Sequence, residues 1–464
     1  MSSIHFKPDL QMTEVAPGVA LLQDKQVTIP IKNLSPGLRD AISQLMACGS
    51  TEEDLNMVVQ GCDGDRGVMR LAANLQRWNE LGFIARTLYL NEQVFATFTP
   101  VAYGRAFEHA VLECHSPLVL SRFALLRTSH DGNGVILESP LSKVEVRLRD
   151  PLATQLVMSL ASPQAPAELL QRITDCHAPV IEEFLTLLIA TRILIQPGSE
   201  DATPALRMWE FHDLLFHSRT RQGRHANGYG GTYRFRDSVQ PLPAVKPAMS
   251  DRSIALTQAD VAELRQHDVP FTSVIESRTS VRQHGKRAIT AVQLGEFLYR
   301  AARLRGKLNT PDGDVANHPY PGGGALYELE LYPIISACEG IDPGVYHYES
   351  ESHRLEVIDG LNPATQRLVE MAQSTAQMSA PPQILIVIAS RFGRLQWKYE
   401  SLSYALTLKH VGVLQHQMYL IATAMQLAPC ALGGGDSDVF ATATRLNYYE
   451  ESSVGEFLLG TLPE

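Results

Sequence analysis

The chain has 464 residues, 45% of them hydrophobic and 19% charged, which is typical of a folded globular protein of roughly two to four domains. Its formal net charge of −10 argues against nucleic acid as the main partner, because phosphate binding requires a basic surface. The six cysteines form no CxxC pair, which favours reduced thiols over a disulfide framework or a zinc site. The N-terminal MSSIHFKPDL lacks the basic-then-apolar pattern of a secretion signal, so we expect a cytoplasmic protein.

The longest apolar run, residues 403–427, is too polar for a membrane span. Lys409, His410 and the stretch 415–417 interrupt it, whereas a span needs about 20 mostly apolar residues. We therefore expect a buried helix and no membrane partner. We assign no chemistry to His410 or His416.

Residues 30–200 contain two diverged copies of a helix–helix–helix–strand pattern. In the first copy, a helix near Leu38–Cys48 precedes a second helix, at whose start Ser50 and Glu53 have the spacing of a capping box. The copy continues with a helix from Val68 to Leu81 and a strand over 83–90.

The second copy repeats this order, with an additional hairpin between the copies. Its predicted elements are helices near 151–160 and 166–174, a helix carrying Val180, Phe184, Leu187 and Leu188, and a strand over 193–195. The preceding strands, 116–128 and 135–149, alternate about the turn at 131–134. The repeat predicts two winged-helix-like modules, 1–110 and 111–200.

Winged helices bind either DNA or peptides. Residues 1–100 carry 8 Lys plus Arg against 11 Asp plus Glu, so the first module is acidic. Its third helix offers only Arg70 and Arg77 as phosphate partners. This pattern favours a structural role or peptide recognition, which we assign to the second module, over binding to nucleic acid.

Residues 201–267 are interpreted as a connector. Pro241, Pro243 and Pro247 are typical of a semi-extended linker. His212, Asp213 and His217 could begin a metal site, but no further cluster stands out to complete a coordination shell, so we expect no metal.

From about residue 268 to residue 464 the pattern changes to α/β. Thr290 and Gln293 have the spacing of a capping box at the start of a helix. The predicted strands are 328–331, a hairpin of 344–348 with 354–358, and a buried central strand over 383–389. With the preceding modules, the predicted fold class is α+β.

Three short motifs in this region could hold a ligand. Arg278, Ser280 and Arg282 bracket a turn on which guanidinium groups could grip phosphate, although such a spacing also occurs in ordinary surface loops. The glycine runs 322–324 and 433–435 permit close backbone approach to a flat ligand; the alternative for each is a flexible turn.

A fourth motif, Trp397-Lys398-Tyr399-Glu400, stands before the long apolar helix. An adjacent Lys and Tyr can serve as a proton-transfer pair, because desolvation disfavours the charged form of a lysine. The alternative is a lysine that extends its ammonium to solvent beside a half-buried tyrosine.

The order RTSVR, PGGGALYELELY, WKYESLSYALTLKHVG and ALGGGDSDVF resembles the nitroreductase-fold flavoproteins of the SagB-type dehydrogenase group, which includes the cyanobactin oxidases. These motifs span residues 276–460. The connector WEFHDLLFHSRTRQGRH…GGTYRF is similar to the segment preceding the catalytic domain in this group, and the N-terminal modules are more weakly similar to its peptide-recognition winged helices.

The resemblance implies an FMN-dependent dehydrogenase that oxidises thiazoline or oxazoline rings in a ribosomally made peptide. It implies a homodimer, with a cyclodehydratase as a candidate further partner. It also implies a mixed sheet with packed helices over 268–464. The implied FMN contacts are Arg278, Ser280 and Arg282 for the phosphate and ribityl chain, and Gly323, Gly324, Ala325, Leu326, Gly433 and Gly434 for the ring.

Lys398 and Tyr399 match the Lys-Tyr pair that the group needs for azoline oxidation. Aromatisation removes a hydride, which flavin accepts, and a proton, which a base must take. Either residue could be that base. Gly322 departs from the family pattern, in which we expect a Ser, so a hydroxyl contact to flavin at this position is in doubt.

Two other classes of function stay open on the sequence. One is a general nitroreductase or small-molecule flavin oxidoreductase, which would use NAD(P)H and would not need residues 1–250. The other is a binding scaffold with a degenerate flavin domain. Retention of the arginine motif, both glycine runs and the Lys-Tyr pair argues against the scaffold.

Overall fold

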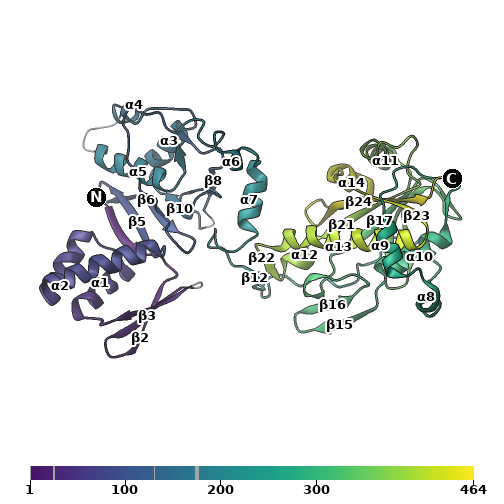
Figure 1. Ribbon diagram of the computed structural model, residues 1–464, viewed down its shortest axis with the longest axis horizontal. Coiled ribbons are helices and arrows are strands. Elements are labelled where there is room, and N and C mark those ends of the chain that lie inside the picture. Colours follow the sequence, from purple (N-terminus) through teal and green to yellow (C-terminus); the bar gives the residue numbers. More distant parts are fainter. Residues whose placement is uncertain (1, 25–26, 130, 173–176) are drawn as a thin grey trace. The chain divides into compact units, whose positions relative to one another are not determined.

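The computed structural model describes residues 2–24, 27–129, 131–172 and 177–464. The chain divides into two compact units, Met1–Asn227 and Gly228–Glu464 (Figure 1). Both units combine helices with sheets, which confirms the predicted α+β class. The unit boundary places residues 228–267 of the predicted connector in unit 2, while the division into four segments stays a prediction.

Unit 1 is built on a six-stranded antiparallel sheet that draws strands from both predicted modules. Its order is β1-β5-β6-β10-β9-β8. The strands are β1 (Ser2–Phe6), β5 (Ile84–Leu90), β6 (Gln93–Pro100), β8 (Leu125–Thr128), β9 (Val135–Glu138) and β10 (Val144–Leu148). Strands β8 and β9 form the predicted hairpin, with Thr128 opposite Val135.

The first module begins with strands that the sequence interpretation missed. β2 (Gln11–Ala16), β3 (Val19–Gln23) and β4 (Thr28–Lys32) form a separate antiparallel sheet. Helix α1 (Pro36–Ala47) agrees with its prediction, whereas the next two predicted helices form α2 (Glu52–Glu80), interrupted at Gly64 by non-helical angles. The cap is Thr51, whose hydroxyl accepts from the Asp54 N–H, so the predicted box at Ser50 and Glu53 was wrong by one residue.

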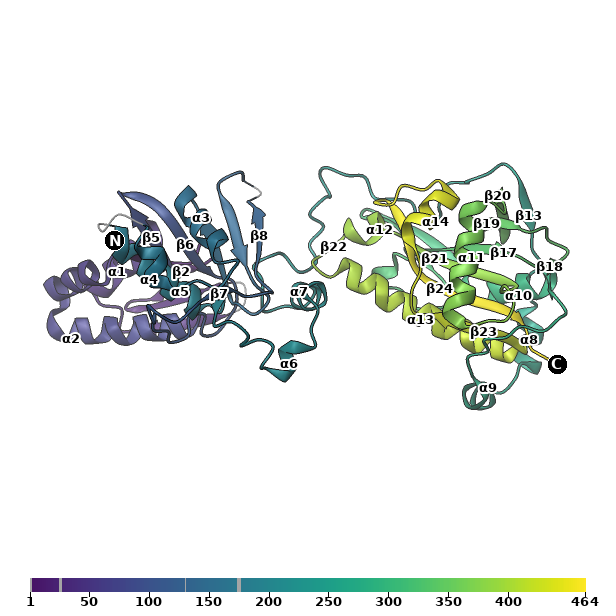
Figure 2. The same cartoon turned by 90° about the horizontal axis from the view of Figure 1, so that it is seen from above.

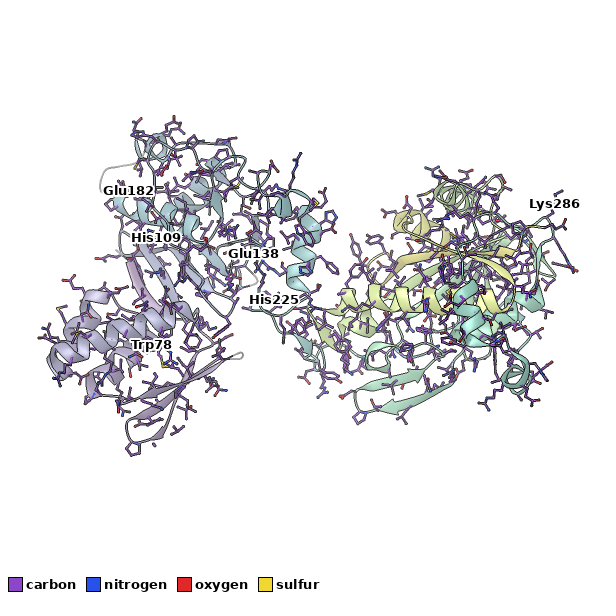
Figure 3. The ribbon with its side chains drawn as sticks, viewed as in Figure 1. Trp78, His109, Glu138, Glu182, His225 and Lys286 are labelled. Carbon is purple, nitrogen blue, oxygen red and sulfur yellow. The ribbon has the colours of Figure 1, made fainter. Side chains whose placement is uncertain are left out.

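The buried side of α2 packs against the sheet of unit 1. Trp78, labelled in Figure 3, is fully buried and lies edge-to-face with Phe6 at 5.1 Å between ring centroids. An aromatic pair of this geometry contributes about 0.5–1.5 kcal/mol beyond its buried area. The contact therefore fixes α2 on the first strand of the chain.

The second copy has its helices close to the predicted ranges. Its elements are α3 (Pro151–Ser159), α4 (Pro166–Leu170), α5 (Ala178–Ala190), β7 (Val119–Leu120) and β11 (Leu194–Ile195). α4 ends earlier than predicted, and residues 173–174 of that prediction, like Cys176, lie outside the described residues.

Part of the predicted connector is helical and belongs to unit 1. α6 (Pro204–Arg207) and α7 (Phe211–Arg219) follow β11. Arg219 donates to Glu138 at 2.7 Å, and Glu138 (Figure 3) also accepts from Arg127 at 2.8 Å. This ion-pair network ties α7 to strand β9.

Among the described ranges, no group of three His, Cys, Asp or Glu side chains is arranged to hold a metal ion.

Unit 2 is built on a seven-stranded sheet in the order β13-β20-β19-β17-β21-β24-β23. These strands pair antiparallel. Their bounds are β13 (Ser253–Ala255), β17 (Leu329–Ile335), β19 (Gly344–Glu349), β20 (Arg354–Gly360), β21 (Ile384–Arg391), β23 (Leu427–Leu432) and β24 (Glu451–Thr461). The predicted hairpin and the predicted central strand are both present.

Short ribbons and helices complete unit 2. The ribbons are β12 (Gly230–Gly231) with β22 (Tyr399–Glu400), β15 (Gly306–Thr310) with β16 (Gly313–Asn317), and the parallel pair β14 (Ile289–Thr290) with β18 (Cys338–Glu339). The helices are α8 (Val261–His267), α9 (Phe271–Ser277), α10 (Ala291–Ala302), α11 (Pro363–Ala376), α12 (Phe392–Gln396), α13 (Ser403–Ala424) and α14 (Ser437–Thr444), with the 3-10 turn η2 (Gly323–Ala325). The capping box of Thr290 and Gln293 is present at α10.

Helices cover both faces of the unit 2 sheet, with α10 and α13 on one face and α11 and α14 on the other (Figures 1 and 2). Alternate residues of β21 divide between the two cores, as the two-residue period of a strand requires: Ile384, Ile386 and Ile388 face the first, and Leu385, Val387 and Ala389 the second. Burial on both faces explains why this strand is continuously apolar.

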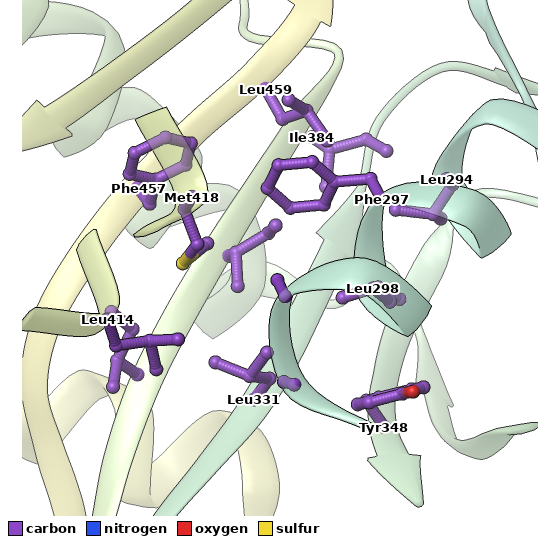
Figure 4. Packing of buried hydrophobic residues seen from close by; sticks show 14 of the residues in the cluster. Leu294, Phe297, Leu298, Leu331, Tyr348, Ile384, Leu414, Met418, Phe457 and Leu459 are labelled. Carbon is purple, nitrogen blue, oxygen red and sulfur yellow. The ribbon is translucent and has the colours of Figure 1, made fainter. Parts of the chain in front are cut away.

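The larger core lies between α10, α13 and the sheet. In Figure 4 the rings of Phe297 from α10 and Phe457 from β24 lie close together, and their centroids are 6.3 Å apart. Met418 and Leu414 enter from α13.

None of the helices in the described part of the chain is long and apolar enough to cross a membrane.

Phe297→Ala tests this core. The ring is fully buried, so its removal should lower the free energy of unfolding of unit 2 by about 3–5 kcal/mol. Urea denaturation of the full chain gives this value. Val292→Ala, on the exposed side of the same helix, should change it by less than about 0.5 kcal/mol. Equal effects of the two substitutions would contradict the described core.

Candidate active site

The loop that carries Gly322–Gly324 is held by a buried histidine of α13. The Gly323 N–H donates to His410 Nε2 at 2.8 Å, so Nε2 is the unprotonated nitrogen. His410 Nδ1 then donates to Glu328 Oε1 at 2.8 Å. Both side chains are buried, and among the described residues the other oxygen of Glu328 has no hydrogen-bond partner. The sequence interpretation assigned no chemistry to His410, yet it orients this loop.

The other end of the loop is held by the buried side chain of Arg394. Its guanidinium donates to the carbonyl oxygens of Leu326, Leu242 (2.6 Å) and Asp314 (3.0 Å). Burial lowers the pKa of Arg394 to about 10, and these carbonyl groups replace its lost hydration. Three backbone segments therefore meet at one side chain of α12.

Between these two anchors the backbone is in an unusual conformation. Gly324, Ala325 and Tyr327 have φ of +64°, +57° and +47°, in the left-handed region. A non-glycine residue in this region costs of order 1 kcal/mol, and such strain persists where surrounding contacts impose it. The hydrogen bonds from His410 and Arg394 are those contacts.

The predicted catalytic pair lies directly against this loop. A Cβ placed on Gly324 would lie 2.6 Å from Tyr399 Oη and 2.9 Å from Lys398 Nζ. Glycine is required there both for its positive φ and because a side chain would occupy the space between the two functional groups. Lys398 and Tyr399 are half-buried. Residues separated by about 70 positions thus meet at one point.

The backbone of Lys398 and Tyr399 is held by the first residues of unit 2. Strand β12 pairs with β22, so that Gly231 lies opposite Tyr399, and the Tyr233 N–H donates to the Lys398 carbonyl at 3.1 Å. Lys398 Nζ lies 5.5 Å from the Tyr233 ring centroid, at cation–π distance. The GGTYRF sequence, noted for its similarity to the family, therefore contacts the predicted catalytic pair.

The arginine motif lies beside strand β23, the strand that leads into the second glycine run. Ser280 Oγ and Tyr419 Oη are hydrogen-bonded at 2.8 Å, and Tyr419 Oη accepts from the Ala431 N–H at 2.8 Å. The Arg278 guanidinium lies 5.3 Å from the Tyr419 ring centroid, while Arg282 is exposed. Tyr419 of α13 thus joins the predicted phosphate motif to the strand that leads into Gly433.

A cavity of about 270 Å³ opens beside the second glycine run, close to the lower end of the size range of small-molecule sites. It is lined by Val411 and Gln415 of α13, Leu432 to Gly435, Ser437, and Ser453 to Glu456 of β24. Gly433 and Gly434, both predicted to contact FMN, are in this lining. Burial raises the pKa of the Glu456 carboxyl to about 7.

The structure therefore gathers the predicted residues into two groups along α13. Lys398, Tyr399 and the loop Gly323–Leu326 form one group, in which Leu326 is itself buried. The arginine motif contacts Tyr419 and strand β23, and Gly433–Gly434 follow the end of that strand and line the cavity without a contact to the motif among the described interactions. Sequence reasoning missed Glu328, Arg394, Tyr419 and Glu456. For the three charged residues, a charge inside an otherwise apolar stretch was the available signal; Tyr419 offered none.

Comparison with known families accounts for most of the chain. The ThcOx helix turn helix domain matches residues 2–109, cyanobactin oxidase ThcOx matches 118–226, and the nitroreductase family matches 275–460. These matches to the cyanobactin oxidase and nitroreductase models support a SagB-type dehydrogenase of the nitroreductase fold. The resemblance stated from the motifs is thereby confirmed, as are the helix-turn-helix character of the N-terminal region and the nitroreductase-like C-terminal domain.

Individual relatives of this chain match over shorter stretches. The microcin B17-processing protein McbC of Escherichia coli is 28% identical over 124 residues, which are 26% of this chain and 45% of McbC. A protein of Methanocaldococcus jannaschii named as a nitroreductase is 25% identical over 174 residues, 38% of this chain and 81% of that protein. A crystal structure of a protein from Ralstonia eutropha named as a nitroreductase is 20% identical to this chain. The match covers 51% of this chain and 99% of that protein, with a TM-score of 0.37.

His410→Ala tests the anchor of the first glycine loop. The substitution leaves the Gly323 N–H and the buried Glu328 carboxylate without their partner, which should lower the free energy of unfolding by about 3 kcal/mol. Urea denaturation measures the change. His416→Ala, on the exposed side of α13, is the matched control and should have little effect. A result in which both variants match the wild type would contradict the anchor.

The raised pKa of Glu456 predicts a pH dependence of stability. Its folded-state pKa of about 7 exceeds the usual 4.5, so the carboxyl contributes stability below pH 4.5 that is lost as the pH rises through 7. Glu456→Gln removes this dependence. Relative to the variant, the wild type should lose on the order of 2–3 kcal/mol between pH 4.5 and pH 8 in chemical denaturation. A constant difference across this range would contradict the assignment.

Proposed function

We propose that the chain is an FMN-dependent dehydrogenase that oxidises thiazoline or oxazoline rings of a ribosomally made, heterocyclised peptide to thiazoles or oxazoles. The observation that carries the proposal is the convergence of Lys398 Nζ and Tyr399 Oη on Gly324. The match to cyanobactin oxidase ThcOx and the similarity to McbC, a microcin B17-processing protein, support a peptide as substrate.

The residues present fit a flavin. A planar ring needs surfaces without side chains, and Gly324 and the cavity beside Gly433 and Gly434 supply them. Arg278, Ser280 and Arg282 would hold the phosphate and ribityl chain, and Gly323, Gly324, Ala325 and Leu326 would lie near the ring. When bound, FMN supplies the acceptor for the hydride that the azoline loses.

The protein's own part in this reaction is to remove a proton. Lys398 and Tyr399 lie side by side at a backbone that carries no side chain, so a substrate ring can approach both. One of them would take the proton from the azoline carbon, and the other would orient it by hydrogen bonding. Pairing of β22 with β12 and the bond from the Tyr233 N–H keep the backbone of the pair in place.

The proposed partners follow from the same assignment. A homodimer is supported by apolar side chains exposed on α9 and α13: Phe271, Ile275, Tyr404, Leu408 and Val413. The second winged-helix-like module, residues 111–200, would recognise the precursor peptide, and a cyclodehydratase would supply the azolines. A cytoplasmic location fits the reduced cysteines.

A visible absorption spectrum and a mass assay test the proposal. The purified full chain should be yellow with bound FMN, and a heterocyclised peptide should lose about 2 Da per oxidised ring as two hydrogens leave. A colourless protein that cannot be reconstituted with FMN, or a peptide of unchanged mass, would contradict it. Which of thiazoline and oxazoline peptides reacts faster can be read from the same assay.

The role of the lysine is tested by Lys398→Ala. Turnover of the heterocyclised peptide should fall at least about 100-fold, in the range of general-base catalysis, while FMN stays bound. The spectrum and the mass assay are measured on the same sample. Lys409→Ala, an exposed lysine of α13, should keep full turnover. Retained turnover in the Lys398 variant would remove this residue from the mechanism.

A second candidate function is reduction of small molecules by a general nitroreductase. It is favoured by the match to the M. jannaschii protein over 81% of that protein's length. This function predicts rapid NAD(P)H oxidation with nitro compounds by the full chain, and no change in the mass of a heterocyclised peptide.

A further inference from the structure

Glu456 is a buried carboxyl in the wall of the cavity beside Gly433–Gly435. It is 7% exposed, and no hydrogen bond or ion pair to its carboxyl group is present among the described residues. The carboxyl lies directly against Gly435, where an added Cβ would overlap both carboxylate oxygens. A side chain at position 435 would therefore displace the Glu456 carboxyl, whose burial is itself unfavourable.

The elements packed around Glu456 offer it no cation. Its strand neighbours are Val387 on β21 and Leu432 on β23, and α13 contributes Val411 and Gln415, whose amide donates to the Glu456 carbonyl rather than to its carboxyl. Ser437 of α14 is bonded to Ser453, and Asp436 caps α14 by accepting from two N–H groups of that helix. Glu456 is the one titratable group in the cavity lining that the structure describes.

This environment makes the charge of Glu456 depend on what fills the cavity. In the absence of a ligand, burial already raises the pKa to about 7. A planar ring in the cavity would remove the remaining water from the carboxyl, which disfavours the ionised form further. A protonated carboxyl can donate a hydrogen bond, whereas an ionised one only accepts. Flavin rings carry nitrogen and oxygen acceptors at their edges.

We propose that Glu456 is a proton-exchanging group of the flavin-binding cavity, so that binding of the flavin ring takes up a proton from water at this carboxyl. The proposal rests on the function proposed above and assigns a ligand-binding role to a residue outside the family's motifs. It separates two tasks along α13, because proton removal from substrate is at Lys398 and Tyr399 while proton uptake on flavin binding is at Glu456.

Titration of the flavin-free full chain with riboflavin tests the proposal. Riboflavin lacks the phosphate of FMN, so the titration of that phosphate does not enter. From a free-state pKa of about 7, the wild-type affinity should weaken about tenfold between pH 6 and pH 8, whereas Glu456→Gln should change less than about twofold. Calorimetry in buffers of different ionisation enthalpy should show uptake of close to one proton at pH 8 by the wild type and almost none by the variant.

Glu370→Gln is the matched control, because this carboxylate on α11 is exposed; it should behave as the wild type. Equal pH dependence of the wild type and Glu456→Gln, or a flat wild-type profile, would overturn the role of Glu456 while leaving the flavin function in place. Failure of both riboflavin and FMN to bind to either protein at any pH would instead overturn the proposed function, and with it this inference.

Discussion

Burial of one long helix, α13, sets the positions of the motifs in unit 2. His410 contacts the first glycine loop, Val411 and Gln415 line the cavity of the second, and Tyr419 binds the arginine motif. At 1.5 Å per residue, His410 and Tyr419 are about 14 Å apart along the axis. Val411, Gln415 and Tyr419 follow each other at four-residue intervals and so share one side of the helix. The sheet side of α13 is thus both core and ligand-binding wall.

Buried polar groups, rather than apolar packing, give the first glycine loop its shape. The loop has residues at positive φ that would relax in isolation. It is fixed because His410 accepts from the Gly323 N–H and Arg394 donates to the Leu326 carbonyl, while the same guanidinium joins it to Leu242 and Asp314. A guanidinium or carboxylate at such a site is costly without its partners. Removing His410 or Arg394 would leave buried polar groups without partners. Their hydrogen bonds therefore both make substitution costly and hold the loop in a single geometry.

Local signals in the sequence predicted local structure well. The capping box at Thr290, the central apolar strand and the long helix depend on neighbouring residues, and all three are present. At α2 two adjacent hydroxyl residues competed for one cap, and Thr51 is the residue whose hydroxyl meets the Asp54 N–H. The early strands β2 to β4 were missed. Nearly all side chains of β2 are exposed, which leaves little alternation to detect, whereas β4 alternates with Ile29 and Ile31 buried but carries Pro30, which argues against a strand.

The site depends on contacts between distant parts of the chain, which pattern alone does not reveal. The family resemblance assigned Lys398, Tyr399 and Gly324 to one site, but the direct approach of the pair to Gly324 was not predicted. Glu328, Arg394 and Glu456 are ordinary charged residues in the sequence, and their importance arises from burial that only the tertiary structure imposes.

The two-residue strand β12 has a consequence for how the site forms during folding. Glu400 is bonded to Thr232 across 168 positions, so closing this ribbon costs more chain entropy than any local turn. Contacts between residues so far apart in the sequence form slowly. They add little stability until the intervening sheet has assembled. The backbone of Lys398 therefore reaches its final geometry late in folding, and a shortened protein that begins at residue 268 would lack the strand that completes it.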